Sequence, residues 1–217
     1  MSTDPDATVC LHLPFHDRRR ADRAVVLCDA DCWAHLSKYH WVVTTDDEGR
    51  PSYVVCDPHG RFPRSLHREC YAFRHGGTAP AGRLVDHINR VRTDCRAANL
   101  RACDASQSAC NRGKALKRKG RAPTSAYKGV WRKKRRVLKS GAEKVEKKPW
   151  VCEVSVKDQD KKHTSCHKTE EEAARKYNEV AREWMGEFAV LNTIVEPAPA
   201  APVAPAAPAD APSSVNA

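Results

Sequence analysis

VDHINRVRTDCRAANLRACDASQSACN, residues 85–111, decides the fold of the first half of this 217-residue chain. An acid stands beside a histidine at Asp86 and His87, and an Asn-Leu pair begins at Asn99, twelve residues after that histidine. Asp104 is followed three residues later by a glutamine, which is the spacing of a capping box at the start of a helix. The stretch therefore predicts the end of a strand, a loop and then a short helix.

The residues before this stretch predict a small mixed unit, which we place at residues 23–114. VVLCDADCWAHLSKYHW, from residue 25, predicts a strand, a helix that opens near Asp29 or Asp31, and an aromatic residue that returns to the core. Residues 1–22 are expected to be poorly ordered. Three segments bounded by Gly and Pro are expected to be further strands or extended segments, namely 52–56, 65–71 and 82–88.

A second small unit is predicted at residues 125–193, after a basic linker at residues 115–124. WVCEVSV, residues 150–156, alternates as a strand does, and we expect three short antiparallel strands here. Thr169 then opens the clearest helix of the chain, with an acid at the capping-box position and an apolar face that should cover the sheet. The fold class is therefore α+β, and the Pro/Ala-rich residues 194–217 are expected to form a disordered tail. The apolar face of the helix is formed by Ala173, Ala174, Tyr177, Val180, Ala181 and Trp184.

The charge of the chain points to a polyanionic partner. Lys and Arg total 38 against 27 Asp and Glu, so the formal net charge is +11. Such a charge suits nucleic acid or an acidic membrane surface, and charge alone does not choose between them. The N-terminus lacks the apolar core of a secretory signal, and no run is long enough to span a bilayer. We therefore predict an intracellular protein that is neither secreted nor embedded in a membrane.

The ten cysteines are scattered without a C-x-x-C pair. Structural zinc sites usually show such close pairs, so the spacing argues against zinc. The nearest candidates, Cys28 with Cys32 and Cys103 with Cys110, are weak. We expect the cysteines to be reduced and to act as small, half-buried apolar residues.

The motif in the opening stretch resembles the HNH endonuclease family, whose site is a β-hairpin closed by a helix over one divalent cation. The shared features are Asp86-His87, the Asn-Leu pair at Asn99, the capped helix and LHR upstream of the hairpin. His67, in that LHR segment, has two open interpretations: it approaches the active site, or it is a core histidine with a satisfied hydrogen bond. The resemblance covers roughly residues 25–114 and implies a ββα-metal nuclease unit.

The resemblance also implies roles for individual residues. His87 would be the general base for an attacking water, Asp86 a metal ligand, and Asn99 the brace that holds the loop and orients the histidine. The second metal ligand of the family falls on Ser108, whose hydroxyl is shorter than the usual amide. Asn111, one helical turn further on, is the alternative ligand, either directly or through a water. The cofactor implied is one divalent ion, Mg²⁺ with Mn²⁺ as the alternative.

The second unit resembles the Apetala-2/ethylene-response-factor type of DNA-binding domain. The resemblance rests on SAYKGVWRKKRR, on WVCEVSV, on the helix from Thr169, and on the order of three strands and a helix. Two departures are a longer first hairpin and the absence of the usual glycine and aromatic before the helix. In that family the sheet lies in the major groove of DNA. The expected contact residues are Lys128, Trp131, Arg132, Arg135, Arg136 and Trp150.

These features together predict an HNH endonuclease that cuts or nicks double-stranded DNA and resembles a homing endonuclease. The partner is duplex DNA, with no membrane and no small-molecule substrate. Two rivals remain open. The first, motivated by Ser108, is a DNA-binding protein that keeps the fold but is catalytically impaired. The second is a basic RNA-binding or scaffold protein. Metal-dependent cleavage separates the enzyme from both.

Overall fold

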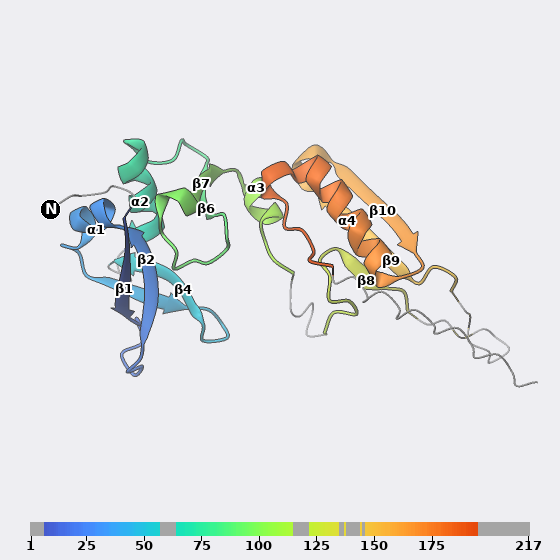
Figure 1. Ribbon diagram of the computed structural model, residues 1–217, viewed down its shortest axis with the longest axis horizontal. Coiled ribbons are helices and arrows are strands. Elements are labelled where there is room, and N and C mark those ends of the chain that lie inside the picture. Colours follow the sequence, from blue (N-terminus) through green and yellow to red (C-terminus); the bar gives the residue numbers. More distant parts are fainter. Residues whose placement is uncertain are drawn as a thin grey trace, which may run out of the picture.

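The computed structural model describes residues 7–56, 64–114, 122–134, 137, 144 and 146–194. Within them the chain forms two units, each with its own hydrophobic core, that meet beside helix α3 (Ala105–Cys110) (Figure 1). The fold is mixed, with helices and antiparallel strands, as predicted.

The N-terminal unit is built from short antiparallel pairs. β1 pairs with β2, β3 with β4 and β5, and β6 with β7. The helices α1 and α2 pack beside these pairs, and α3 follows the β6–β7 hairpin. The bounds are β1 (Thr8–Pro14), β2 (Arg23–Asp29), α1 (Ala30–Leu36), β3 (Trp41–Thr45), β4 (Pro51–Cys56), β5 (Arg64–Ser65), α2 (Leu66–His75), β6 (Leu84–His87), the 3-10 turn η1 (Ala97–Asn99), β7 (Leu100–Cys103) and α3.

Several predicted elements of this unit are present. β2 and α1 follow the predicted strand and helix, and Trp41 returns to the core, where its indole Nε1 donates to the carbonyl of Leu36 at 2.9 Å. The capping box of α3 is complete, since the side chains of Asp104 and Gln107 each accept from the other's backbone N–H. The capping box therefore begins a helix at the position that the sequence predicted.

Two predictions for this unit are wrong. Residues 1–22 were expected to be poorly ordered, but β1 lies within them and pairs with β2 along its whole length, from Thr8 opposite Asp29 to Pro14 opposite Arg23. The segment 65–71 was expected to be a strand or an extended segment, but only Ser65 lies in a strand and residues 66–71 belong to α2. Leu66 and Cys70 lie four residues apart on the buried side of that helix.

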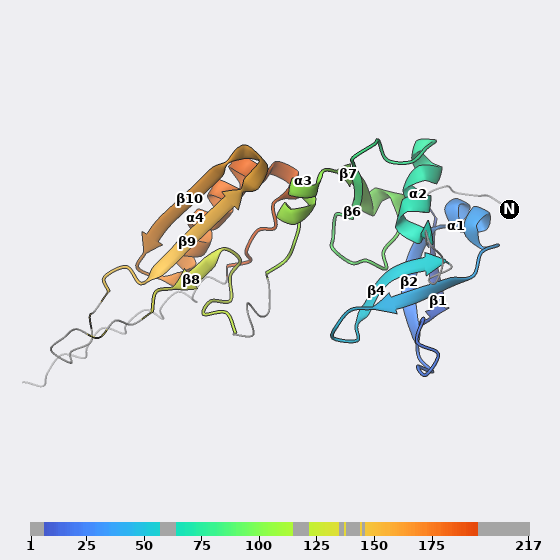
Figure 2. The ribbon, with the colours of Figure 1, turned by 180° about the vertical axis from the view of Figure 1, so that it is seen from behind.

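The C-terminal unit is a three-stranded antiparallel sheet covered by one helix. The strand order is β10-β9-β8, as expected for three short antiparallel strands. Figures 1 and 2 show α4 lying along one face of this sheet, and the helix contacts β9, the central strand, more than either neighbouring strand. The bounds are β8 (Val130–Arg132), β9 (Trp150–Val156), η2 (Lys157–Gln159), β10 (Lys161–His167), α4 (Glu170–Met185) and η3 (Gly186–Phe188).

The helix α4 begins where its cap was predicted, because the Thr169 side chain accepts from the backbone N–H of Glu172 at 3.1 Å. Five of the six predicted face residues are buried, and Trp184 is half-buried at the edge of the core. Gly129, just before β8, has φ +70 and lies directly under the ring of Tyr177. A side chain at residue 129 would therefore collide with the helix that covers the sheet.

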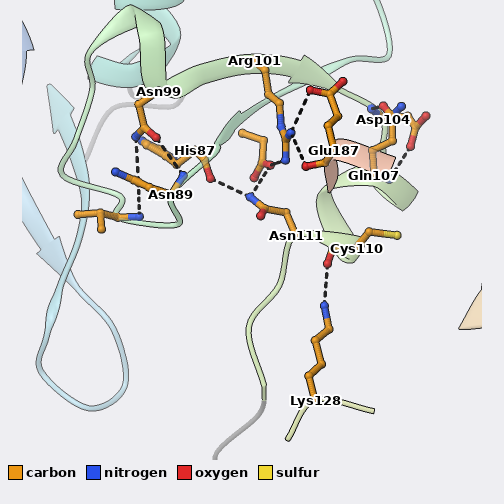
Figure 3. A network of polar contacts seen from close by, with 12 residues as sticks. His87, Asn89, Asn99, Arg101, Asp104, Gln107, Cys110, Asn111, Lys128 and Glu187 are labelled. Carbon is orange, nitrogen blue, oxygen red and sulfur yellow. Dashed lines mark hydrogen bonds and ion pairs between the residues drawn. The ribbon is translucent and has the colours of Figure 1, made fainter. Parts of the chain in front are cut away.

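Among the described residues, polar contacts join the two units (Figure 3). Lys128 Nζ donates to the carbonyl of Cys110, the last residue of α3, at 2.7 Å. Arg101 Nη1 on β7 donates to the carbonyl of Glu187 at 3.1 Å, and its guanidinium carbon lies 3.8 Å from the centre of the Phe188 ring. Both contacts join the C-terminal unit to the segments that carry the predicted site.

Some predictions fall outside the described residues. These are most of the basic linker at residues 115–124 and nearly all of the tail at residues 194–217. Among the described residues, no helix is both long and apolar enough to cross a membrane.

Candidate active site

The β6–β7 hairpin and α3 place the predicted site residues side by side. Asp86 and His87 are the last two residues of β6, paired with Arg101 and Leu100 of β7. Adjacent strand residues point to opposite faces. The two side chains therefore leave the strand in different directions, the imidazole into the core and the carboxylate toward α3.

His87 is buried and lies in a group of rings. It is 4% exposed, and its ring centre is 5.0 Å from that of His67 and 6.4 Å from that of Tyr53. Its Nε2 is buried without a hydrogen-bond partner among the described residues. Burial lowers the pKa of His87 to about 4, although the charges of Asp86 and Asp94 oppose this shift. The imidazole is therefore neutral near pH 7, so one of its ring nitrogens carries a free lone pair.

His67 lies beside the predicted base. It belongs to α2, and its Nδ1 is buried without a hydrogen-bond partner among the described residues. Burial, and then the charge of His87, lowers its pKa to about 3. Two interpretations of His67 were left open. A core histidine with a satisfied hydrogen bond is not supported, because Nδ1 has no partner among the described residues. An approach of His67 to the site agrees with the 5.0 Å between its ring centre and that of His87.

Asn111, the cap residue directly after α3, contacts Asp86, and Figure 3 shows the Asn111 side chain next to the end of that helix. The Asn111 Nδ2 donates to Asp86 Oδ2 and to the carbonyl of His87, both at 2.8 Å. Asn111 is 6% exposed, so these contacts are buried. Ser108 lines the same cleft but makes no hydrogen bond to Asp86 among the described contacts. Of the two helix residues considered as ligands, Asn111 is thus the one that meets the carboxylate.

The positively charged side chain of Arg101 also faces Asp86. The Arg101 Nη2 lies 3.6 Å from Asp86 Oδ2, and the Arg101 side chain is only 12% exposed. Its Nε and Nη2 have no hydrogen-bond partner among the described residues. The Asp86 carboxylate therefore has one amide donor and one guanidinium within reach.

Asn99 braces the loop between the two strands. Its Oδ1 accepts from the backbone N–H of Asn89 at 2.9 Å, and its Nδ2 donates to Asn89 Oδ1 at 3.0 Å and to the carbonyl of Asp94 at 2.8 Å. Its own carbonyl accepts from Ile88 N–H at 2.8 Å. These bonds fix the backbone just after His87. No described contact joins the Asn99 side chain to the imidazole itself.

A cleft of about 1090 Å³ opens over these residues. Its lining includes Asp86, His87, His67, Ser108 and Asn111, so most of the predicted nuclease residues share it. The rest of the lining is strongly basic, which favours a polyanion such as a nucleic-acid backbone. The basic side chains are Arg50, Arg68, Arg90, Arg92, Arg112 and Lys114.

The donor set suits a hard divalent cation. Asp86 offers a carboxylate, Asn111 carries an amide oxygen beside the nitrogen that donates to Asp86, and Ser108 offers a hydroxyl in the same cleft. Mg²⁺ and Mn²⁺ prefer such oxygen ligands and retain waters in open sites. The residues therefore fit the cation implied by the resemblance, with the charge of Arg101 as the opposing feature.

The residues of the second unit that were predicted to contact DNA differ in exposure and in position. Trp131 on β8 is 41% exposed and Arg132 beside it is exposed, with its guanidinium carbon 5.6 Å from the ring centre of a half-buried Trp150. Lys128 is half-buried and donates to α3, and burial lowers its pKa to about 8. The remaining two candidates, Arg135 and Arg136, lie outside the described residues.

Sequence reasoning missed three residues of the site. Tyr53 lines the cleft and lies against His67, and Arg92 stacks over Tyr53 with its guanidinium carbon 4.7 Å from the ring centre. Arg101 reaches Asp86 from the neighbouring strand. Tyr53 and Arg92 reach the site from β4 and from the loop after β6, and no local spacing marked them. Arg101 directly follows the Asn-Leu pair, which is the one signal that could have drawn attention to it.

Comparison with known proteins supports the nuclease interpretation. Residues 64–109, which run from β5 through α3, match the model of the HNH endonuclease family. An uncharacterized HNH endonuclease of Acanthamoeba polyphaga mimivirus is 29% identical over 167 residues, which cover 76% of this chain and 72% of the viral protein. No solved structure matches the chain significantly. The chain thus contains a region similar to the HNH endonuclease domain, a family whose members are nucleases that act on DNA and generally use a divalent metal ion.

Proposed function

We propose that this protein is a metal-dependent endonuclease that cuts or nicks double-stranded DNA in the basic cleft. The observation that carries the proposal is the junction of Asp86, His87 and Asn111 on the wall of that cleft. A carboxylate and an amide beside a neutral, buried imidazole form the minimum set for hydrolysis of a phosphodiester.

In the proposed reaction, the arginines of the cleft bind the phosphates on either side of the scissile bond. His87 takes a proton from the attacking water, and Asn99 keeps the loop after His87 in place through Asn89 and Asp94. The water oxygen bonds to phosphorus while the bond from phosphorus to the 3′-oxygen breaks. Asp86 and Asn111 would hold the cation, with Ser108 bound through a water. When bound, the cation neutralises charge on the scissile phosphate and the leaving 3′-oxygen.

The C-terminal unit is proposed to be the DNA reader, similar to the Apetala-2/ethylene-response-factor type. The exposed Trp131 and the neighbouring Arg132 on β8 form the accessible part of its candidate surface, next to Trp150. A short antiparallel sheet fits the major groove, where arginine reads guanine with two hydrogen bonds. Arg135 and Arg136 complete the proposed set. A nuclease joined to such a reader is consistent with a homing endonuclease.

The proposal is tested by incubating the full chain with plasmid and with duplex DNA taken from the chain's own genomic flanks, each with Mg²⁺ or Mn²⁺. Cleavage should require metal and stop with EDTA. His87→Ala should lower the rate by about 10²- to 10⁴-fold while duplex binding stays unchanged. His75→Ala is the matched control, because His75 is exposed on α2 outside the cleft. Full activity in His87→Ala would reject His87 as the base.

One observation favours the rival of a DNA-binding protein with impaired catalysis. Arg101 and the Asn111 amide nitrogen both face the Asp86 oxygen that a cation would use, and Ser108 replaces the usual second ligand. That rival would stand if the wild-type protein bound duplex DNA but left it intact with every divalent metal tried. Preference for RNA in a competition assay would instead support the RNA-binding alternative.

A further inference from the structure

Three buried cysteines from three different elements meet in the core of the N-terminal unit. Cys28 lies near the end of β2, Cys32 in α1 and Cys70 in α2. Their Sγ atoms all lie within 4.8 Å of one another, and none of the three residues is more than 2% exposed. The spacing of these residues along the chain hid this cluster, because Cys70 is remote in sequence and the first two form a C-x₃-C pair.

The distances between the three sulfur atoms fit a bound metal ion better than ordinary packing of apolar side chains. Zinc bound tetrahedrally by thiolates at about 2.3 Å places neighbouring sulfurs about 3.8 Å apart. Cys28 Sγ lies 3.6 Å from Cys70 Sγ, close to that edge length. An ordinary core contact needs no such convergence of three sulfurs on one point. The three side chains face one another through their sulfur atoms.

A fourth cysteine and a nearby cation complete the surroundings. Cys95 is fully buried in the same core cluster, but its Sγ lies outside the group of three and contacts the carbonyl of Arg92 at 3.9 Å. Structural zinc sites almost always have four ligands. Arg74 reaches Asp29 and Asp31, the sequence neighbours of Cys28 and Cys32, at 3.7 and 3.5 Å. A site with three or four thiolates carries net negative charge, which this arginine opposes.

We infer that Cys28, Cys32 and Cys70 bind a structural zinc ion, and that Cys95 turns its side chain away from Arg92 to become the fourth ligand. This site is separate from the nuclease centre in chemistry as well as position, because soft thiolates select zinc and hard oxygens select Mg²⁺ or Mn²⁺. It revises the expectation from sequence spacing that zinc is absent.

The zinc would tie together four parts of a small unit. β2, α1 and α2 each supply one ligand, and Cys95 lies in the loop that Asn99 braces. Cys70 is one helical turn after His67, so the same ion would fix the helix that brings His67 beside His87. Because the ion would bind the folded chain, its removal should lower the stability of this unit.

The test is cobalt substitution in the reduced, metal-free full chain. Co²⁺ bound by several thiolates gives a sulfur-to-metal charge-transfer band in the near ultraviolet and strong visible bands of a tetrahedral complex. Mg²⁺ in excess should leave these bands unchanged, and about one equivalent of Zn²⁺ per chain should remove them. Zinc should also raise the melting temperature. These signals report sulfur ligation and do not depend on nuclease activity.

Variants then identify the ligands. Cys32→Ala and Cys70→Ala should abolish the charge-transfer band, and Cys95→Ala should weaken it by about a quarter because one of four sulfur bonds is lost. Cys103→Ala is the matched control, since Cys103 is also fully buried but lies outside the cluster, and the band should persist. An unchanged band in Cys95→Ala would overturn the fourth ligand.

The wild-type chain alone can overturn the inference, even if a variant fails to fold. A folded, reduced protein without a thiolate band would show that the three cysteines only pack together. A Cys28–Cys70 disulfide in peptides mapped without reductant, from protein purified without oxidant, would do the same.

Discussion

Asn111 Nδ2 donates to Asp86 Oδ2 at 2.8 Å, so the last turn of α3 is fastened to the end of β6. The same amide donates to the carbonyl of His87 at 2.8 Å. One side chain therefore positions both the proposed metal ligand and the backbone of the proposed base.

Replacement of Asn111 by alanine should lower metal affinity or cleavage rate by at least about 10- to 100-fold, because the variant loses a proposed ligand and also the amide that orients Asp86. Calorimetric titration with Mn²⁺ and a cleavage time course measure the two quantities. Ser108→Ala is the control on the same helix and should have a smaller effect, since Ser108 makes no described contact with Asp86. Equal losses in the two variants would contradict the assignment of Asn111.

Replacement of Arg101 by methionine should tighten metal binding several-fold. The change removes a positive charge 3.6 Å from Asp86 Oδ2 while keeping most of the apolar stem of the side chain. It also removes the contacts to Glu187 and Phe188, so the melting temperature should fall. Arg50→Met is the control, because Arg50 lines the cleft but pairs with Asp46 at 2.8 Å. Unchanged Mn²⁺ affinity in Arg101→Met would show that the guanidinium does not compete with the cation.

Replacement of Gly129 by alanine should unfold the C-terminal unit or destabilise it by about 2 to 5 kcal/mol. A positive φ costs an alanine about 1 to 2 kcal/mol, and a forced core contact adds about 1 to 3 kcal/mol. Here the new Cβ would meet the Tyr177 ring and lie 2.8 Å from the carbonyl of Glu153. Gly49→Ala separates the two terms, since Gly49 has φ +75 but nothing within 4 Å of the added carbon. Urea denaturation of both variants gives the comparison, and similar free energies of unfolding would contradict the packing argument.

Binding to duplex DNA should depend strongly on salt. If the basic cleft and β8 together neutralise about six to ten phosphates, affinity should fall by roughly 10³- to 10⁵-fold between 50 and 200 mM salt. Fluorescence anisotropy with a labelled duplex at several salt concentrations measures the slope. A nearly flat dependence would place the positive charge of these surfaces outside the DNA interface.

The sequence predicted those parts of the fold that local chemistry determines. The caps at Asp104 and Thr169 and the return of Trp41 to the core all depend on neighbours within a few residues. Strand β1 and helix α2 could not be predicted in this way. β1 is ordered by its pairing with β2, and α2 by burial of Leu66 and Cys70 against other elements, so tertiary contacts decide both.

The same distinction holds for the site. The residue types at Asp86, His87 and Asn99 were readable because their spacing is fixed within one hairpin. The contacts of Arg101 with η3 and of Tyr53 with His67 join segments far apart in the chain, and no spacing encodes them. The choice between Ser108 and Asn111 needed the direction of α3 relative to β6, which only the folded chain provides.

The contacts of Lys128 and Arg101 across the junction affect how this protein could be redesigned. Lys128 binds the carbonyl that ends α3, and the 187–188 turn binds the arginine next to Asp86. A chimera that exchanged the C-terminal unit, the proposed reader, for another domain would therefore also remove two supports of the proposed nuclease site. Retargeting should begin with the exposed residues of β8 and should carry Lys128, Glu187 and Phe188 over unchanged.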